Sequence, residues 1–234
     1  MPDNPKTLFD FEEKHWWYRT RRSLILELMK QYVPEQNLRI LDVGTGTGFM
    51  LRYLERWGTA QGLDINPDVT KFSKSDRISV MNFPSQVPDE KYDVITAFDV
   101  LEHMEDDRAG VIAIASLLNE GGRFVLTVPA LPVLWSRHDE FHCHKRRYTR
   151  RQLSLLLELN DFQILKLSYF QTILFLPVFV IRQFQKKGKA ETDIKPVNPV
   201  LNDALEFLFS LEIPFLRNHN LPIGSSLIAV CVKK

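Results

Sequence analysis

An apolar run at residues 38–43 stops abruptly at the segment Gly44-Thr-Gly-Thr-Gly48. A strand that runs directly into alternating glycines brings its backbone close to a ligand, because a Cβ atom would block the approach. In sheets built from βαβ units, such a turn lies at the carboxyl end of the first strand, where ligands bind. The segment therefore predicts an α/β fold with a ligand site beside Gly44, Gly46 and Gly48.

Short apolar strands and helical patterns alternate after this turn, which predicts a doubly wound, Rossmann-like parallel sheet. We expect helices at residues 23–32, 50–57, 108–118, 149–160 and 201–211, and strands at residues 38–43, 60–65, 92–98, 123–128, 162–167 and 226–232. A capping box of Thr149 and Gln152 is expected to start the fourth helix, a turn is expected at Gly121-Gly122, and a polar linker at residues 186–199. We expect one domain over residues 1–234, with an N-terminal helical lid (1–35), a cofactor-binding core (36–166), a helical insertion (167–224) and a last strand (225–234).

Charge and cysteine content limit the classes of function. The 30 basic and 29 acidic residues leave a formal charge of +1, so we expect no nucleic-acid partner bound through bulk charge. Two cysteines make no disulfide framework, and the first ten residues lack the apolar core of a signal peptide. These features predict a cytoplasmic protein.

Two carboxylates accompany the glycine turn and favour a cationic ligand. Asp42 precedes the first glycine by two residues, and Asp64 ends the next expected strand, where it can accept hydrogen bonds from ribose hydroxyls. A nicotinamide-binding turn would carry its third glycine one residue later, and Asp42 would repel a pyrophosphate. The ammonium and sulfonium of S-adenosylmethionine suit Asp42 better. A tight turn without a ligand, and an NAD-dependent oxidoreductase, stay open as alternatives.

Four ordered segments resemble the motifs of class I S-adenosylmethionine-dependent methyltransferases. They are Leu41-Asp-Val-Gly-Thr-Gly-Thr-Gly48, Gly62-Leu-Asp-Ile-Asn66, Tyr92-Asp-Val-Ile-Thr-Ala-Phe-Asp-Val-Leu-Glu-His103, and residues 117–129. The resemblance covers roughly residues 36–166. It implies a seven-stranded sheet whose last strand is antiparallel, with S-adenosylmethionine as cofactor. It also implies these cofactor-binding residues: Asp42, Gly44, Gly46 and Gly48 on the methionine side, Asp64 at the ribose, Ile65 at the adenine, and Phe98 and Asp99 near the methionine end. Near position 82 the family often has an acid that meets the adenine amino group; this chain departs from that pattern, with Met81, Asn82 and Phe83 as candidates and Asn82 as the one chosen.

The segment after the fifth core strand, residues 135–148, is expected to face the acceptor. An oxygen nucleophile benefits from a nearby base, and His138 and His144 are the candidates; hydrogen-bonded loop histidines are the alternative. His103 is a further candidate, for an orienting role. A metal set of His138, His142 and His144 with Asp139 or Glu140 matches no standard zinc spacing, so we expect no metal.

Three segments, residues 15–22, 138–140 and 144–149, are similar to sequence features shared by a group of bacterial methyltransferases, although the last has one extra residue here. We associate that group with surface polysaccharide or lipid-linked pathways. Adjacent tryptophans cannot share one helix face, so at least one of them is expected to face a pocket. Solvated arginines on a helix are the alternative. The expected substrate-contacting residues are Trp16, Trp17, Arg19, Arg22, Arg146, Arg147 and Tyr148.

The apolar segment 167–184 is the least explained part of the chain. It contains Pro177 and is too short for a membrane span. It is interpreted as a buried helix, a wall of the acceptor site, or a peripheral membrane contact. We thus predict methyl transfer to a small or lipid- or sugar-linked acceptor, at oxygen; a non-catalytic binding protein is the alternative from another class.

Overall fold

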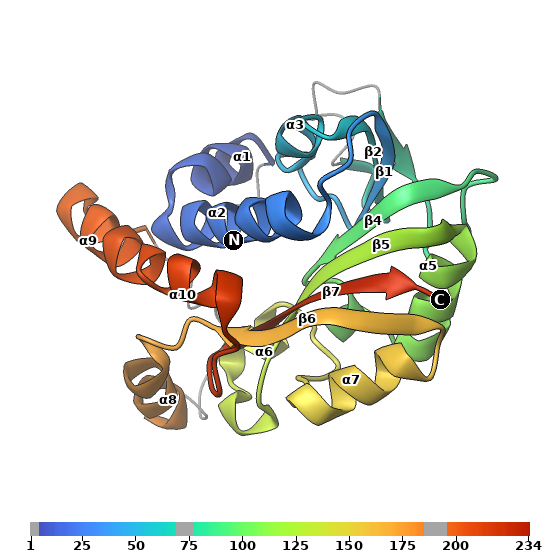
Figure 1. The fold of residues 1–234 in the computed structure, drawn as a ribbon. Helices are drawn as coiled ribbons and strands as arrows, with labels where there is room; N and C mark the ends of the chain where they lie inside the picture. Colours follow the sequence, from blue (N-terminus) through green and yellow to red (C-terminus); the bar gives the residue numbers. More distant parts are fainter. Residues whose placement is uncertain (1–4, 69–76, 185–195) are drawn as a thin grey trace.

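A seven-stranded sheet in the order β3-β2-β1-β4-β5-β7-β6 forms the centre of the computed structural model (Figure 1). The structure describes residues 5–68, 77–184 and 196–234. β7 pairs antiparallel with both β5 and β6, and the pairs among β1 to β5 are parallel, as expected. The strands are β1 (Leu38–Val43), β2 (Gly58–Asp64), β3 (Ile78–Val80), β4 (Tyr92–Phe98), β5 (Leu118–Pro129), β6 (Phe162–Phe170) and β7 (Ser226–Lys233).

Helices cover both faces of the sheet, as a doubly wound fold requires. Alternating side chains of β4 show this, because Ile95 belongs to the buried cluster that includes α5 residues and Val94 to the cluster that includes α2 residues. The helices are α1 (Pro5–Lys14), α2 (Trp16–Tyr32), α3 (Leu51–Leu54), α5 (Asp107–Leu117), α6 (Arg137–Phe141), α7 (Arg150–Glu158), α8 (Phe175–Phe184), α9 (Pro199–Ser210) and α10 (Glu212–Asn218).

Helix caps explain where two helices begin. The Thr149 side chain accepts a hydrogen bond from the backbone N–H of Gln152, whose side chain accepts one from Thr149 in return, which is the expected capping box. α2 begins at Trp16, seven residues earlier than expected, because Nδ1 of His15 accepts a hydrogen bond from the Trp17 N–H at 3.3 Å. Histidine is an unusual N-cap, so the sequence carried no standard start signal.

Two expected boundaries differ from the structure. β5 begins at Leu118 and includes the Gly121-Gly122 pair, which was expected to be a turn before the strand; Gly121 has a φ of +71° within it. β6 continues to Phe170, past the expected start of the insertion at residue 167, because Leu167 to Phe170 pair with β7 and are buried.

The insertion consists of α8, α9 and α10, which lie beside the sheet in Figure 1. Most of the polar linker expected at residues 186–199 lies outside the described residues. Among the helices that the structure describes, none has the length and apolar character needed to cross a membrane.

Candidate active site

The glycine turn after β1 is shaped by two different demands on its glycines. Gly44, Gly46 and Gly48 have φ values of +69°, +56° and +75°, a region that other residues rarely adopt. A Cβ atom on Gly44 would lie 2.5 Å from Cγ2 of Val100, whereas one on Gly46 would meet nothing within 4 Å. Gly44 therefore serves the packing of the turn, and Gly46 leaves open space beside a cavity of about 100 Å³.

Asp42 places a buried carboxylate at the wall of this smaller cavity. Its Oδ1 accepts a hydrogen bond from Oγ1 of Thr96 at 2.5 Å. Burial raises the pKa of Asp42 to about 6. No ion pair in the described parts of the chain joins Asp42, so a cationic ligand would supply the positive charge that this carboxylate lacks.

Asp64 stands at the end of β2 and ties the glycine turn to the neighbouring strand. Its Oδ2 accepts a hydrogen bond from the Gly46 N–H at 2.8 Å, and its Oδ1 accepts one from Asn66 at 2.9 Å. The Ile65 side chain is 66% exposed beside it, as a surface that stacks on a ligand would be. Asn82 is exposed and follows β3, whose end lies next to Asp64 through the bond from Met81 N to the Asp64 carbonyl.

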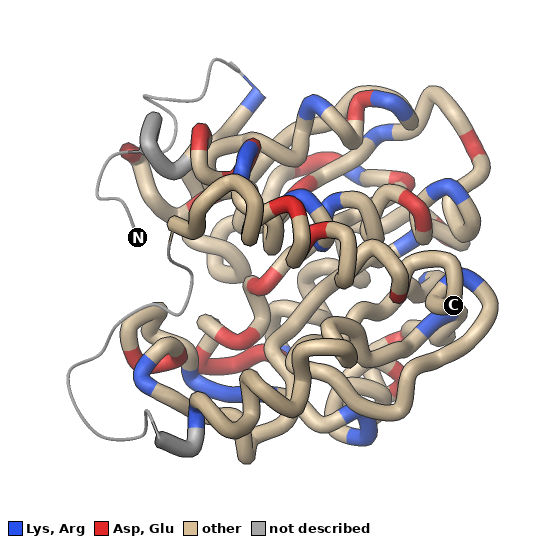
Figure 2. The backbone as a smooth tube through the Cα atoms, turned by 90° about the vertical axis from the view of Figure 1, so that its left-hand side faces the viewer, with Lys and Arg blue, Asp and Glu red and all other residues tan. Residues whose placement is uncertain are grey.

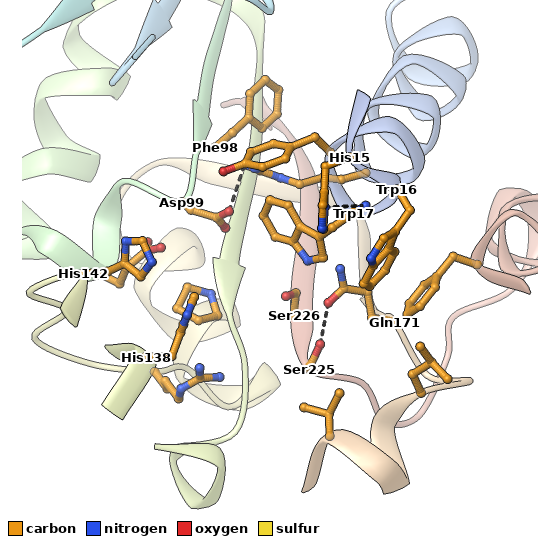
Figure 3. Close-up of a pocket in the computed structure, with 18 of the residues that line it drawn as sticks. His15, Trp16, Trp17, Phe98, Asp99, His138, His142, Gln171, Ser225 and Ser226 are labelled. Carbon is orange, nitrogen blue, oxygen red and sulfur yellow. Dashed lines mark hydrogen bonds and ion pairs between the residues drawn. The ribbon is translucent and has the colours of Figure 1, made fainter. Parts of the chain in front are cut away.

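A second cavity of about 430 Å³ adjoins the end of β4 (Figure 3). Phe98 lines both cavities, and so does Arg21 of α2. Arg21 forms an ion pair with Oδ2 of Asp99 at 2.9 Å and donates a hydrogen bond to Oγ1 of Thr127. These contacts fasten α2 over the edge of the sheet, and they place Asp99 where the two cavities meet. Arg21 belongs to the expected N-terminal lid, but its pairing with Asp99 was not predicted.

Histidines gather on one wall of the larger cavity, where His103, His138, His142 and His144 all line it. Burial lowers the pKa of His138 to about 2 and that of His142 to about 4. Burial also lowers the pKa of His103, and the nearby His144 adds to this effect. At neutral pH these three imidazoles are therefore uncharged and can act as ligands or hydrogen-bond partners.

His144 has a buried acidic partner. Its Nδ1 lies 2.9 Å from Oδ1 of Asp139, a carboxylate that is fully buried and also accepts a hydrogen bond from Nε of Arg147 at 2.8 Å. Burial alone would raise the pKa of Asp139, but the hydrogen bond from His144 and the Arg147 charge outweigh it and hold that pKa well below its ordinary value. The pair fixes the orientation of the His144 ring, with Nε2 as its remaining nitrogen.

Glu102 is the site residue that sequence reasoning missed. It lines the larger cavity and is 0% exposed, and neither carboxylate oxygen has a hydrogen-bond partner among the residues that the structure describes. Burial raises its pKa well above the ordinary value. Its signal in the sequence was its position directly before His103, on the turn that follows β4.

The opposite part of the larger cavity is aromatic and aliphatic. Trp16 and Trp17 lie across it from His138 and His142 in Figure 3. Trp16 stacks on Phe209 of α9 with ring centroids 5.0 Å apart. The rest of this apolar wall comes from the insertion, through Leu174, Val178 and Leu205.

Several residues expected to contact substrate have other partners. Arg19 pairs with Glu206 of α9 at 3.0 Å, and Arg22 lies over Phe49 and Tyr53 beside the smaller cavity. Arg146 pairs with Asp107 at 2.9 Å and donates hydrogen bonds to two backbone carbonyls. The buried Tyr148 donates its hydroxyl proton to Asp107 at 2.7 Å. None of these four lines the larger cavity, whereas Arg147 does.

α1 brings a further acid to the glycine turn. Glu12 contacts Oγ1 of Thr47 and lines the smaller cavity with Asp42. Burial raises the pKa of Glu12 to about 7. Arg21 and Arg22 line the same cavity, so its two acids face two bases. On the side of the molecule shown in Figure 2, basic and acidic residues are likewise interspersed.

The residues around the smaller cavity suit S-adenosylmethionine chemically, while the cavity itself, at about 100 Å³, has room for only part of that molecule. Gly46 leaves room for a ligand against the backbone, Asp42 is a buried carboxylate that lacks a cation, and Asp64 ends the adjacent strand. Asp42 would hold the ammonium group, and Asp64 with Ile65 would hold the nucleoside.

Known proteins share both the sequence pattern and the fold. Residues 14–167 match the model of a family described as a methyltransferase domain. A ubiquinone biosynthesis O-methyltransferase from Hydrogenovibrio crunogenus is 30% identical over 140 residues, which cover 51% of this chain and 58% of that protein. The chain spans about half the length of the curated relatives it matches.

Solved structures show the same fold at low sequence identity. A SAM-dependent methyltransferase from Archaeoglobus fulgidus is 22% identical with a TM-score of 0.55, over 97% of this chain and 99% of that one. An S-adenosylmethionine-dependent methyltransferase from Clostridium acetobutylicum is 11% identical with a TM-score of 0.58, over 92% of each chain.

Proposed function

The chain belongs to the methyltransferase domain family, and we propose that it methylates an oxygen atom of a small amphipathic acceptor. It is an S-adenosylmethionine-dependent methyltransferase of class I. The observation that carries the proposal is the adjacency of two cavities that share Phe98 and Arg21, with the glycine turn on one side and the histidines on the other. Methyl transfer is an in-line displacement at carbon, so the protein mainly has to align two partners.

Oxygen is favoured as the nucleophile by the polar wall of the larger cavity. A hydroxyl acceptor must lose a proton, and His144 is oriented for proton transfer by Asp139. His138 is less suited to this role, because an imidazole with a pKa of about 2 has too little affinity for a proton to accept one from a hydroxyl group. The curated relatives named as O-methyltransferases of ubiquinone biosynthesis support transfer to oxygen.

The apolar wall favours an acceptor with an apolar portion. Its polar end would lie against Asp99 and the histidines, and its apolar end would lie against Trp16, Leu174 and Phe209. Pockets of a few hundred Å³ bury most of a small ligand, so both ends contribute to recognition. A lipid-linked phenol or alcohol satisfies this pattern; a wholly polar sugar does not.

α8 and α9 extend the apolar wall to the outside of the molecule. Leu176 is 67% exposed, Ile181 51%, and Phe207 64%, while Val178 and Phe209 on the same two helices line the cavity. A bilayer surface that covers these outer side chains would present a lipid-linked acceptor directly to the cavity. We therefore include peripheral membrane contact in the proposal.

A panel of acceptors tests the reaction. The protein is incubated with S-adenosylmethionine and one of three compounds: a phenol with a long alkyl chain, the same phenol without the chain, and the corresponding amine with the chain. We expect an O-methylated product, found by mass spectrometry, from the alkylated phenol and at least tenfold lower kcat/KM without the chain. Methylation of the amine alone would overturn transfer to oxygen.

His144 is tested by substitution in the same assay. We expect His144→Ala to lower kcat by about 10²–10⁴-fold, the usual contribution of proton-transfer catalysis, with little change in S-adenosylmethionine affinity. His219→Ala is the matched control, because His219 follows α10 and does not line the cavity. Equal rates for the two variants would remove His144 from the reaction.

Vesicle flotation tests the membrane contact. The unmodified protein is expected to float with vesicles of mixed zwitterionic and anionic lipids, and Leu176→Asp with Phe207→Asp is expected to stay at the bottom of the gradient. A matched double variant, Leu159→Asp with Ile112→Asp, changes exposed apolar residues near α7 and on α5. Flotation that is lost equally in both double variants would count against this surface.

A further inference from the structure

Three potential metal-ligating side chains converge on the polar wall of the larger cavity. A carboxylate oxygen of Glu102 and one ring nitrogen each from His103 and His144 lie within 4.8 Å of one another. We propose that Glu102, His103 and His144 bind a divalent metal cation, which holds the oxygen of the methyl acceptor. The inference deepens the proposed function, because the ion would lie in the cavity assigned to the acceptor.

Glu102 supplies the strongest argument for a missing ligand. It is fully buried, and both of its oxygens lack a partner. An unpaired buried carboxylate is costly, and protonation would only replace an unsatisfied acceptor by an unsatisfied O–H donor. A cation bound at the cavity surface would satisfy the carboxylate in its ionised form.

The charges around Glu102 leave this carboxylate uncompensated. Arg21 is paired with Asp99 at 2.9 Å, and Arg147 is paired with Asp139 at 2.8 Å. Each arginine is thus matched by another carboxylate, and Glu102 forms no ion pair with either. A cation would give Glu102 the direct partner that neither of these two arginines supplies.

His144 is oriented as metal-bound histidines are. Its Nδ1 is occupied by Asp139, which is itself held by Arg147, so Nε2 is the nitrogen left for a ligand. A carboxylate behind the ligating imidazole fixes its tautomer and orientation. The rings of His103 and His144 lie at 82° to each other with centroids 4.8 Å apart.

One carboxylate and two imidazoles suit Zn²⁺ or Mn²⁺, with open positions for water and acceptor. Bonds of about 2.0–2.2 Å place tetrahedral ligand atoms roughly 3.5 Å apart, so the three atoms would have to draw closer than 4.8 Å. The bound ion would lower the pKa of an acceptor hydroxyl so that its proton passes to water. In this arrangement His144, assigned above to proton transfer, would instead hold the ion. From the sequence we expected no metal. The ligand set considered there, within residues 138–144, shares only His144 with the proposed set, because Glu102 and His103 lie on the separate turn after β4.

Titration with Co²⁺ tests the proposal, because its visible absorption reports coordination by protein ligands. The chelator-treated full chain is titrated without S-adenosylmethionine or acceptor, so the result is independent of the proposed reaction. We expect one Co²⁺ per chain, displaced by Zn²⁺, and at least tenfold weaker binding in Glu102→Gln and in His144→Ala. We also expect Zn²⁺ to raise the Tm of the unmodified protein but not that of Glu102→Gln.

Glu105→Gln is the matched control, because Glu105 lies three residues from Glu102 and pairs with Lys145 at the surface. Its Co²⁺ affinity is expected to equal that of the unmodified protein. If Glu102→Gln fails to fold, as judged by circular dichroism, His103→Asn provides the same comparison. No saturable uptake by the unmodified protein, or equal affinity in Glu102→Gln and Glu105→Gln, would overturn the proposal.

Discussion

Asp42 makes cofactor binding depend on pH. Its folded pKa of about 6 lies above the ordinary value of 3.8, so below pH 6 the free protein carries a neutral acid that attracts an ammonium group less. We expect the affinity for S-adenosylmethionine, measured by isothermal titration, to rise roughly tenfold between pH 5 and pH 7 and then level off.

Substitution of this residue provides the control. In Asp42→Asn we expect at least tenfold weaker binding at pH 7 and no step near pH 6, whereas Glu12→Gln should keep that step. The free variant should also be more stable than the unmodified protein at pH 7. The reason is that a raised folded pKa means that ionisation of Asp42 destabilises the fold as pH rises from 3.8 through 6. An unchanged pH profile in Asp42→Asn would contradict this assignment.

The two glycines of the turn should respond differently to alanine. Gly44→Ala adds a clash with Val100 to an unfavourable φ, so we expect a loss of several kcal/mol in unfolding free energy. Gly46→Ala faces only the φ cost of about 1–2 kcal/mol, but its methyl group enters the cavity. Thermal unfolding measures the loss of stability in each variant, and titration with S-adenosylmethionine measures the loss of affinity. Equal unfolding free energies for Gly44→Ala and Gly46→Ala would contradict the different roles assigned to the two glycines.

At the residue scale, the sequence revealed what lies close along the chain and missed what the fold brings together. The proximity of Asp42 and Asp64 could be predicted, because they lie at the carboxyl ends of β1 and β2, which are neighbours in the sheet. The contacts of Arg21 and Glu102 could not, because they depend on α2 crossing the end of β4 and on a cavity wall built from residues 102–147. Arg146 was expected at the substrate but pairs with Asp107 of α5.

At the element scale, α2 and α9 depend on each other. Trp16 stacks on Phe209, and the Trp16 N–H donates a hydrogen bond to Oδ1 of Asn202 at 2.8 Å. A double-mutant cycle with Trp16→Ala and Phe209→Ala is expected to give a coupling free energy of about 0.5–1.5 kcal/mol in unfolding. The free energies of unfolding lost in Trp16→Ala and Phe141→Ala should simply add, because these two residues do not touch. A coupling free energy of zero between Trp16 and Phe209 would show that their stacking does not stabilise the fold.

The insertion shows why element boundaries were harder to predict than the core. Apolar residues run without a periodic break from residue 167 to 181, yet the first four belong to β6 and the later ones to α8. Only pairing with β7 assigns Leu167 to Phe170 to the sheet, and that partner lies about sixty residues later. A continuous apolar run carries no period that distinguishes a buried strand from a helix.

At the scale of the whole molecule, β7 holds one half of the sheet together. It pairs with β5 and β6 along its whole length, and Leu227, Ile228, Ala229 and Val230 are fully buried. Removal of residues 226–234 would leave two unpaired strand edges, so we expect no cooperative unfolding transition by circular dichroism. Removal of Lys234 alone should cost less than about 1 kcal/mol, since only one backbone hydrogen bond is lost.

Because β7 lies at the end of the chain, the two cavities of the site are completed at different stages of synthesis. The smaller cavity is lined by residues between Glu12 and Phe98, whereas the larger cavity joins His15 to Ser226. All residues that line the smaller cavity are therefore synthesised before residue 100, whereas the larger cavity is complete only after β7 has paired between β5 and β6. We therefore expect the part of the site that would recognise the acceptor to form last as the chain folds.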